Sequence, residues 1–168
     1  MKLKLILLLF LLIPLFGIAQ CEAIINWKYN GEIAVYEKPE GKKIVSLKND
    51  QKNENFLSLE IIEETDNFFN VNISLAMTSK SYKGWIKKDK YIGAIARQEK
   101  EFMNLILYDK PSQKDSKKTE LDKWKSKFIT IVKCEGNWTF ISISYKGKRT
   151  VGWIESNKLC ANNYSTCS

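Results

Sequence analysis

The fold of this chain is decided by residues 136–154, which read GNWTFISISYKGKRTVGWI. Apolar and polar side chains alternate along residues 141–144, and a strand with one buried face shows that alternation. Residues 145–149 combine a glycine with charged side chains and predict a turn, after which residues 151–154 return as a closing strand. The stretch therefore predicts antiparallel strands that carry several aromatic side chains.

Three short motifs, two of which lie in this stretch, occur twice in the chain, in the same order and at near-equal spacing. They are a tyrosine followed three positions later by proline, an aromatic residue after asparagine, and Gly-Trp-Ile. Their positions are 36–39 and 108–111, 66–68 and 136–138, and 84–86 and 152–154. Duplicated motifs with conserved spacing indicate that one small unit is used twice.

Further strands follow from turn residues that separate apolar runs. Residues 23–29 and 32–36 are expected to form a hairpin, because Asn30-Gly31 between them favours a type I′ turn. A second hairpin is expected from residues 56–63 and 68–74, and its repeat from residues 128–133 and 138–145.

Helix-forming residues are few. Residues 94–104 contain good helix formers and are expected to link the two copies, while residues 121–127 are expected to form one or two helical turns. The polar residues 49–55 and 112–119 predict loops at matching points of the two copies. Loops of this kind carry binding residues or are tolerated insertions, and both interpretations stay open.

The first nineteen residues predict a signal peptide. Lys2 and Lys4 precede the apolar residues 5–18, and small residues lead to an expected cleavage between Ala19 and Gln20. A membrane helix is the alternative, but the apolar run is shorter than a bilayer requires, and no other run in the sequence is long enough. A lipid anchor on Cys21 is a second alternative, which the bulky Gln20 before it disfavours.

Four cysteines follow the expected cleavage point. An even number in an exported chain predicts two disulfides. Cys160 and Cys167 flank a polar tail that a local bridge would hold, which leaves Cys21 with Cys134. A bridge between Cys134 and Cys160 inside the second copy is the alternative. The sequence lacks histidine and Cys-x-x-Cys spacing, so no metal site is expected.

The absence of histidine also removes every mechanism that uses an imidazole base. Carboxylates such as Glu63 and Glu64 remain, but neighbouring side chains on a strand point to opposite faces, and solvated charges are the simpler interpretation. We therefore expect a protein that is not an enzyme and that uses no cofactor.

The repeated motifs together resemble the bacterial SH3-like domain over residues 33–92 and 105–160. That family folds as a small five- or six-stranded β-barrel, which closes its sheet edges. Its members are targeting modules of exported cell-wall enzymes or stand-alone periplasmic or secreted proteins. The resemblance implies a mostly β protein with two tandem barrels. The expected organisation is a signal peptide at 1–19, a first domain with an N-terminal hairpin at 20–92, a linker with helix-forming residues at 93–104, a second domain at 105–160 and a tail at 161–168.

The resemblance also implies where a ligand would bind. Aromatic side chains near the loops would line a groove, because stacking on flat rings gives affinity at a small ordering cost. The first copy has Phe68 where the second has Trp138, so we expect the first to be the degenerate copy. The expected ligand-binding residues are Tyr36, Phe68, Trp85, Tyr108, Trp138, Tyr145 and Trp153.

The formal net charge is +8, and lysines gather around Trp85. A basic surface interleaved with aromatic residues can bind nucleic acid. Export argues against that partner and favours a cell-wall fragment, a peptide or another exported protein. A lysine-rich surface without a partner is an equal alternative. The expected basic face consists of Lys83, Lys87, Lys88 and Lys90.

The leading hypothesis is a non-catalytic binding protein of the periplasm or cell exterior, without a membrane span after cleavage. It would recognise a peptide-like or cell-wall-derived ligand through aromatic-lined grooves. The alternative is a basic protein that docks on, or inhibits, another exported protein.

Overall fold

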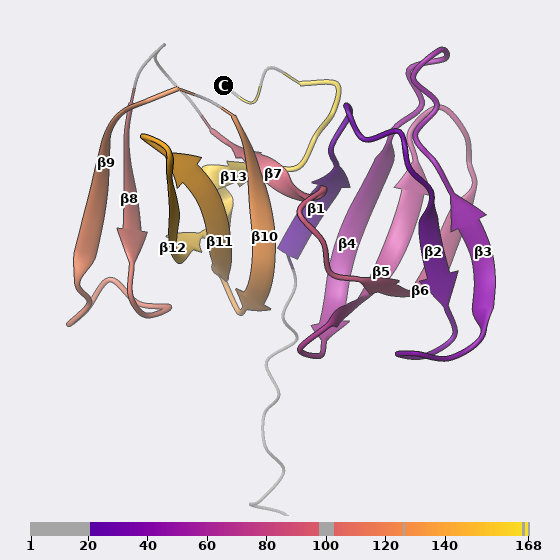
Figure 1. Cartoon of the computed structure of the whole chain (residues 1–168), viewed down its shortest axis with the longest axis horizontal. Coiled ribbons are helices and arrows are strands. Elements are labelled where there is room, and N and C mark those ends of the chain that lie inside the picture. Colours follow the sequence, from indigo (N-terminus) through magenta and orange to yellow (C-terminus); the bar gives the residue numbers. More distant parts are fainter. Residues whose placement is uncertain (1–20, 98–102, 126, 166, 168) are drawn as a thin grey trace, which may run out of the picture.

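The computed structural model describes residues 21–97, 103–125, 127–165 and 167, and these form an all-β protein (Figure 1). The predicted mostly β class is confirmed. The predicted signal peptide lies outside the described residues. Within the described part of the chain, no helix is long and apolar enough to cross a membrane.

The first half of the chain is a series of short strands, drawn from indigo to pink in Figure 1. They are β1 (Cys21–Ile25), β2 (Ile33–Tyr36), β3 (Lys43–Leu47), β4 (Leu57–Glu64), β5 (Phe68–Leu75), β6 (Ser81–Lys87) and β7 (Ile92–Ala96).

The second half repeats this series. Its strands are β8 (Met103–Tyr108), β9 (Lys118–Trp124), β10 (Phe128–Glu135), β11 (Trp138–Tyr145), β12 (Lys148–Glu155) and β13 (Leu159–Cys160), with a 3-10 turn at Ser156–Lys158. The strand pairings recur as well. β4–β5 corresponds to β10–β11, β2–β6 to β8–β12, β1–β4 to β7–β10, and β1–β7 to β7–β13.

The strands form one antiparallel sheet that is not closed into a barrel, so the prediction of two closed barrels is wrong. The sheet order is β3-β2-β6-β5-β4-β1-β7-β10-β11-β12-β8-β9, with β13 beside β7. Closure of the first half would require β3 to pair with β4, but β4 already pairs with β1 and β5. In the second half, β10 likewise pairs with β7 and β11. A strand has only two hydrogen-bonding edges, so both are used.

The expected hairpin of residues 23–29 with 32–36 does not form. β1 pairs with β4 and β7 instead of β2. The chain turns away earlier than Asn30-Gly31, because the backbone N–H of Tyr29 donates to the Asn26 carbonyl at 2.8 Å. The Tyr29 ring then stacks on Tyr91, with 4.0 Å between ring centroids.

The two predicted helices are also strands where the structure describes them. Residues 94–96 belong to β7, which lies between β1 and β10, and residues 121–124 belong to β9. Gly93 permits the close approach of β10, since a Cβ there would lie 2.0 Å from the Ile129 carbonyl oxygen. Pairing with β10 on one side and β13 on the other outweighs the helix propensity of residues 94–96.

The other predicted hairpins are confirmed. β4 pairs with β5 and β10 with β11 at nearly the expected bounds. The turn between β11 and β12 places Lys146 at φ 47° and Gly147 at φ 77°. Two successive positive φ angles are typical of a type I′ turn, in which glycine has no steric cost.

One apolar cluster extends across both halves. Ile61 and Ile86 contribute to it from the first half, Ile131 and Ile154 from the second, and Ala94 from β7 between them. The halves therefore share their core instead of burying two separate ones, which matters because a unit of about sixty residues is marginal alone.

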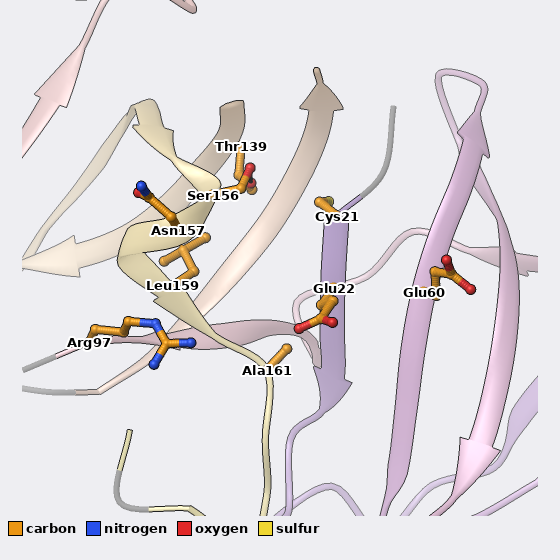
Figure 2. A pocket seen from close by; sticks show the side chains of 9 residues that line it. All are labelled: Cys21, Glu22, Glu60, Arg97, Thr139, Ser156, Asn157, Leu159 and Ala161. Atoms are coloured by element: carbon orange, nitrogen blue, oxygen red, sulfur yellow. Dashed lines mark hydrogen bonds between the residues drawn. The ribbon is translucent and has the colours of Figure 1, made fainter. Parts of the chain in front are cut away.

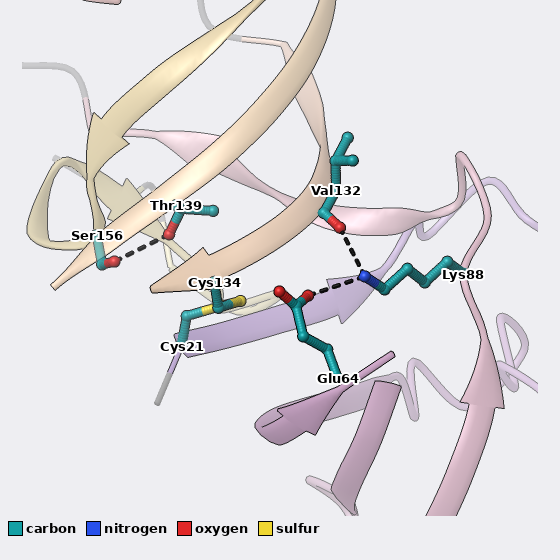
Figure 3. Close-up of a disulfide and its surroundings, with 7 residues drawn as sticks. All are labelled: Cys21, Glu64, Lys88, Val132, Cys134, Thr139 and Ser156. Atoms are coloured by element: carbon teal, nitrogen blue, oxygen red, sulfur yellow. Dashed lines mark hydrogen bonds and ion pairs between the residues drawn. A yellow bond between two sulfur atoms is a disulfide. The ribbon is translucent and has the colours of Figure 1, made fainter. Parts of the chain in front are cut away.

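Specific polar and covalent contacts also join the halves (Figure 3). The Lys88 ammonium donates to Glu64 at 2.9 Å and to the Val132 carbonyl of the second half at 3.1 Å. A disulfide joins Cys21 of β1 to Cys134 of β10, with Cα atoms 6.1 Å apart. Side chains and backbone of the two halves are thus linked at the same place.

The second disulfide, Cys160–Cys167, closes the C-terminal tail, so both predicted pairings are confirmed. Two disulfides are typical of chains that fold in an oxidising compartment outside the cytoplasm. The Cys21 sulfur bonded to Cys134 is not available for a lipid thioether.

Candidate ligand-binding site

A row of side chains crosses five strands on the outer face of the second half. The cross-strand neighbours, taken in order from β9 to β10, are Lys118, Tyr108, Trp153, Phe140 and Lys133. Side chains of directly opposed residues lie on the same face and touch one another. The second half therefore carries three adjacent aromatic rings with a lysine at each end, and we call this set the aromatic row.

The rings of the aromatic row are packed against one another. Trp153 and Phe140 have centroids 5.2 Å apart, and Tyr108 meets the neighbouring Trp138 edge-to-face at 5.4 Å. Such contacts stabilise the pair beyond the area that they bury. Trp153 is only 8% exposed and Tyr108 9%, whereas Phe140 and Trp138 are half-buried.

Both lysines of the aromatic row lie over aromatic rings. The Lys118 nitrogen is 5.7 Å from the Tyr108 centroid, and the Lys133 nitrogen is 5.7 Å from the Trp153 centroid. A cation in this position is attracted by the electron-rich face of the ring. The row thus combines flat apolar surface with a lysine at each end, and Lys133 also pairs with Glu135 at 3.3 Å.

The first half has a different row at the equivalent positions. From β3 to β4 the neighbours are Lys43, Tyr36, Trp85, Asn70 and Glu63. Asn70 replaces the third ring and its amide faces the Glu63 carboxylate at 3.4 Å. The first half therefore ends in an amide and a negative charge where the second has an aromatic ring and a lysine.

Two further aromatic residues of the predicted binding set are Phe68 in the first half and Tyr145 in the second. Phe68 meets Tyr36 edge-to-face at 6.0 Å, which repeats the contact of Trp138 with Tyr108. Tyr145 lies at the other end of β11 from Trp138 and packs on Trp124 at 6.4 Å. Tyr145 is therefore not part of the same aromatic surface.

Tyr145 belongs instead to a small polar cluster with Asp122 and Lys146. Its hydroxyl donates to the Asp122 carboxylate, and the Lys146 ammonium donates to the same carboxylate at 2.9 Å. These hydrogen bonds, that of Tyr145 first, lower the pKa of Asp122 to about 2. Hydrogen bonding with Tyr145 and then with Asp122 raises the pKa of Lys146.

The four lysines of the expected basic face have different surroundings. Lys83 and Lys87 are exposed on β6, on the same face as Trp85 between them. Lys88 is instead largely buried in the junction, where its side chain is 16% exposed and pairs with Glu64. Lys90 is exposed in the turn before β7, and its carbonyl accepts a hydrogen bond from Thr130 at 3.1 Å.

A cavity at the junction of the halves was not anticipated from the sequence. Its volume is about 480 Å³. Figure 2 shows the Glu22 carboxylate of β1 and the guanidinium of Arg97, directly after β7, extending toward the space. Thr139 and Ser156, whose hydroxyl oxygens are 2.9 Å apart, form another side. Glu60, Asn157, Leu159, Ala161 and Cys21 complete the lining.

A second cavity of about 490 Å³ adjoins the first, because Glu22, Glu60 and Ala161 line both. The C-terminal tail borders it and is held against the first half. There the Tyr164 hydroxyl donates to the Glu54 carbonyl at 2.7 Å and accepts from the Phe56 N–H at 3.0 Å.

Sequence patterns could have found part of these sites. Phe140 follows Trp138 by two positions and so shares its face of the strand. The lysines of the aromatic row, and the presence of Glu22 and Arg97 in the lining of one cavity, depend on pairing between strands that no local pattern encodes. Among the described residues, no group of three or more acidic, cysteine or histidine side chains could hold a metal ion.

No protein-family model matches the chain, and no curated protein or solved structure matches it significantly.

Proposed function

We propose that this protein is an exported, non-catalytic binding protein that recognises a peptide-like or cell-wall-derived ligand on the outer face of its second half. The observation that carries the proposal is the aromatic row, in which Tyr108, Trp153 and Phe140 adjoin between two lysines. The motifs that resemble bacterial SH3-like domains support the same class of function.

The chemistry of the row fits such a ligand. Half-buried rings such as Phe140 and Trp138 offer apolar area that needs little ordering on binding. Lys118 and Lys133 would attract the carboxylates of a peptide or an anionic wall polymer. The exposed Val151 and Ile106 flank the row on β12 and β8, and they extend its apolar surface.

Sedimentation of the protein with purified cell wall tests the proposal. Trp138→Ala and Phe140→Ala are expected to lower binding about tenfold each, since stacking contributes on the order of 1 kcal/mol or more. Trp85→Ala, which removes a half-buried ring from the first half, is expected to retain wall binding. Circular dichroism verifies that each variant is folded.

Unchanged wall binding in both second-half variants would refute the proposal. If charge reversal at Lys83 and Lys87 then abolished capture of an exported protein, the function would be protein docking instead.

A further inference from the structure

The cavity at the junction has opposite charges on its walls that do not neutralise each other. Within the described part of the chain, neither Arg97 nor Glu22 takes part in an ion pair, although both line the cavity. Arg97 follows β7 and Glu22 lies on β1, two strands that pair with each other. The space between them is therefore bounded by a guanidinium and a carboxylate.

The backbone positions of both residues are fixed by neighbouring strands. Glu22 is flanked on β1 by the disulfide of Cys21, and its own backbone pairs with Glu60 of β4. The Arg97 N–H donates to the Lys158 carbonyl at 2.8 Å, which fixes the start of that side chain beside β13. A fixed backbone leaves only the two side chains to be ordered on binding.

The rest of the lining offers hydrogen bonds and a small apolar surface. In the pair of Thr139 and Ser156, one hydroxyl donates to the other, so the second hydroxyl proton remains for a further acceptor. Leu159 and Ala161 provide the apolar part. The cavity volume of about 480 Å³ lies within the range of small-molecule sites.

We infer that the junction cavity binds a small zwitterionic peptide. Arg97 binds the carboxylate of the peptide and Glu22 binds its ammonium group, while the Ser156 hydroxyl, held by the buried Thr139, contacts its backbone. Leu159 and Ala161 limit the side chains to small apolar groups. This site is separate from the aromatic row, which lies on the opposite face of β11 from Thr139.

Isothermal titration with three dipeptides tests the assignment. Dialanine carries both charges, N-acetyl-dialanine lacks the ammonium, and dialanine amide lacks the carboxylate. The unblocked dipeptide is expected to bind at least about tenfold more tightly than either blocked form, because each blocked form loses a hydrogen bond to a charged group. Equal affinity for the three dipeptides, or no heat with dialanine at millimolar concentration, would overturn the inference.

Two variants identify the residues. Arg97→Gln is expected to abolish the preference for the free carboxylate, and Glu22→Gln the preference for the free ammonium. The matched control is Arg149→Gln, which changes the other arginine of the chain, located on β12. Phe140→Ala, which tests the aromatic row, should leave dialanine binding unchanged, so the two sites can fail independently. Loss of selectivity in Arg149→Gln, or its retention in both cavity variants, contradicts the assignment.

Discussion

The two halves of this protein have the same strand pairings but different outer faces. Tyr36 opposes Trp85 in the first half as Tyr108 opposes Trp153 in the second. One strand further, the first half has Asn70 where the second has Phe140. The scaffold is thus repeated closely, while the surface that could recognise a ligand is not.

This difference shows which side chains determine the pairing. The inward residues Ile61 and Ile131 occupy equivalent positions, each directly before a bulge in its hairpin. Their burial fixes the register, because a slip of one residue would expose the whole apolar set. Outward residues such as Glu63 and Lys133 are released from that constraint and can diverge in charge.

The largest expected effect distinguishes the disulfide at the junction of the halves from the disulfide within the second half. Replacing Cys21 and Cys134 by alanine removes a cross-link between residues 113 apart, whereas Cys160 and Cys167 are only 7 apart. Chain entropy predicts a loss of about 5 kcal/mol for the first pair and about 2 kcal/mol for the second. Guanidinium denaturation of the two double variants measures both values. Equal losses would mean that the junction disulfide does not constrain the unfolded chain.

A tryptophan comparison tests the two rows directly. Trp153 is 8% exposed beside Phe140, while Trp85 is half-buried beside Asn70. Trp153→Ala is expected to cost about 3–4 kcal/mol of unfolding free energy, and Trp85→Ala about half of that. Thermal or chemical unfolding of the two variants gives the answer. A larger loss at Trp85 would indicate that the first row, not the second, is the better packed.

Local patterns were sufficient for the parts of the fold that are local. The hairpins whose second strands begin at Phe68 and Trp138 follow from alternation and turn residues, and both form as expected. The repeat predicted the equivalence of Trp85 with Trp153. These features depend on residues near each other in sequence, for which spacing alone is informative.

The arrangement of the halves was not predictable in this way. Whether the repeats close or join depends on β1 and β7, which occupy the edges of β4 and β10 that are not paired with β5 and β11. Residues 94–96 have helix-forming side chains, yet neighbouring strands on both sides place them in the sheet. Tertiary pairing overrode local propensity there, and the same long-range pairing created the junction cavity.

An intermediate effect is expected at the ion pair of the junction. Lys88→Met keeps the apolar stem but leaves Glu64, with a side chain 14% exposed, without its cation. Loss of one partner of a largely buried pair is expected to cost about 2–3 kcal/mol. The control is Lys133→Met, whose pair with Glu135 has side chains 50% and 53% exposed and is expected to contribute under about 1 kcal/mol. Equal losses in denaturant titrations would mean that Lys88 does not stabilise the junction.

The smallest expected effect is a pH dependence confined to the first half. Burial and then the adjacent Tyr29 raise the pKa of Tyr91 to about 12 from an ordinary 10.0. The folded state therefore holds this proton more tightly than the unfolded state. The contribution of the neutral Tyr91 to stability is complete below pH 10 and is lost progressively as pH rises toward 12.

The corresponding position of the second half is Leu159, which does not titrate, so Tyr91→Leu is the matched variant. Denaturation at pH 9, 10 and 11 should show a steeper decline for the natural chain than for Tyr91→Leu, because lysine deprotonation affects both equally. Parallel declines would place the alkaline sensitivity elsewhere, and the halves would then not differ in this respect.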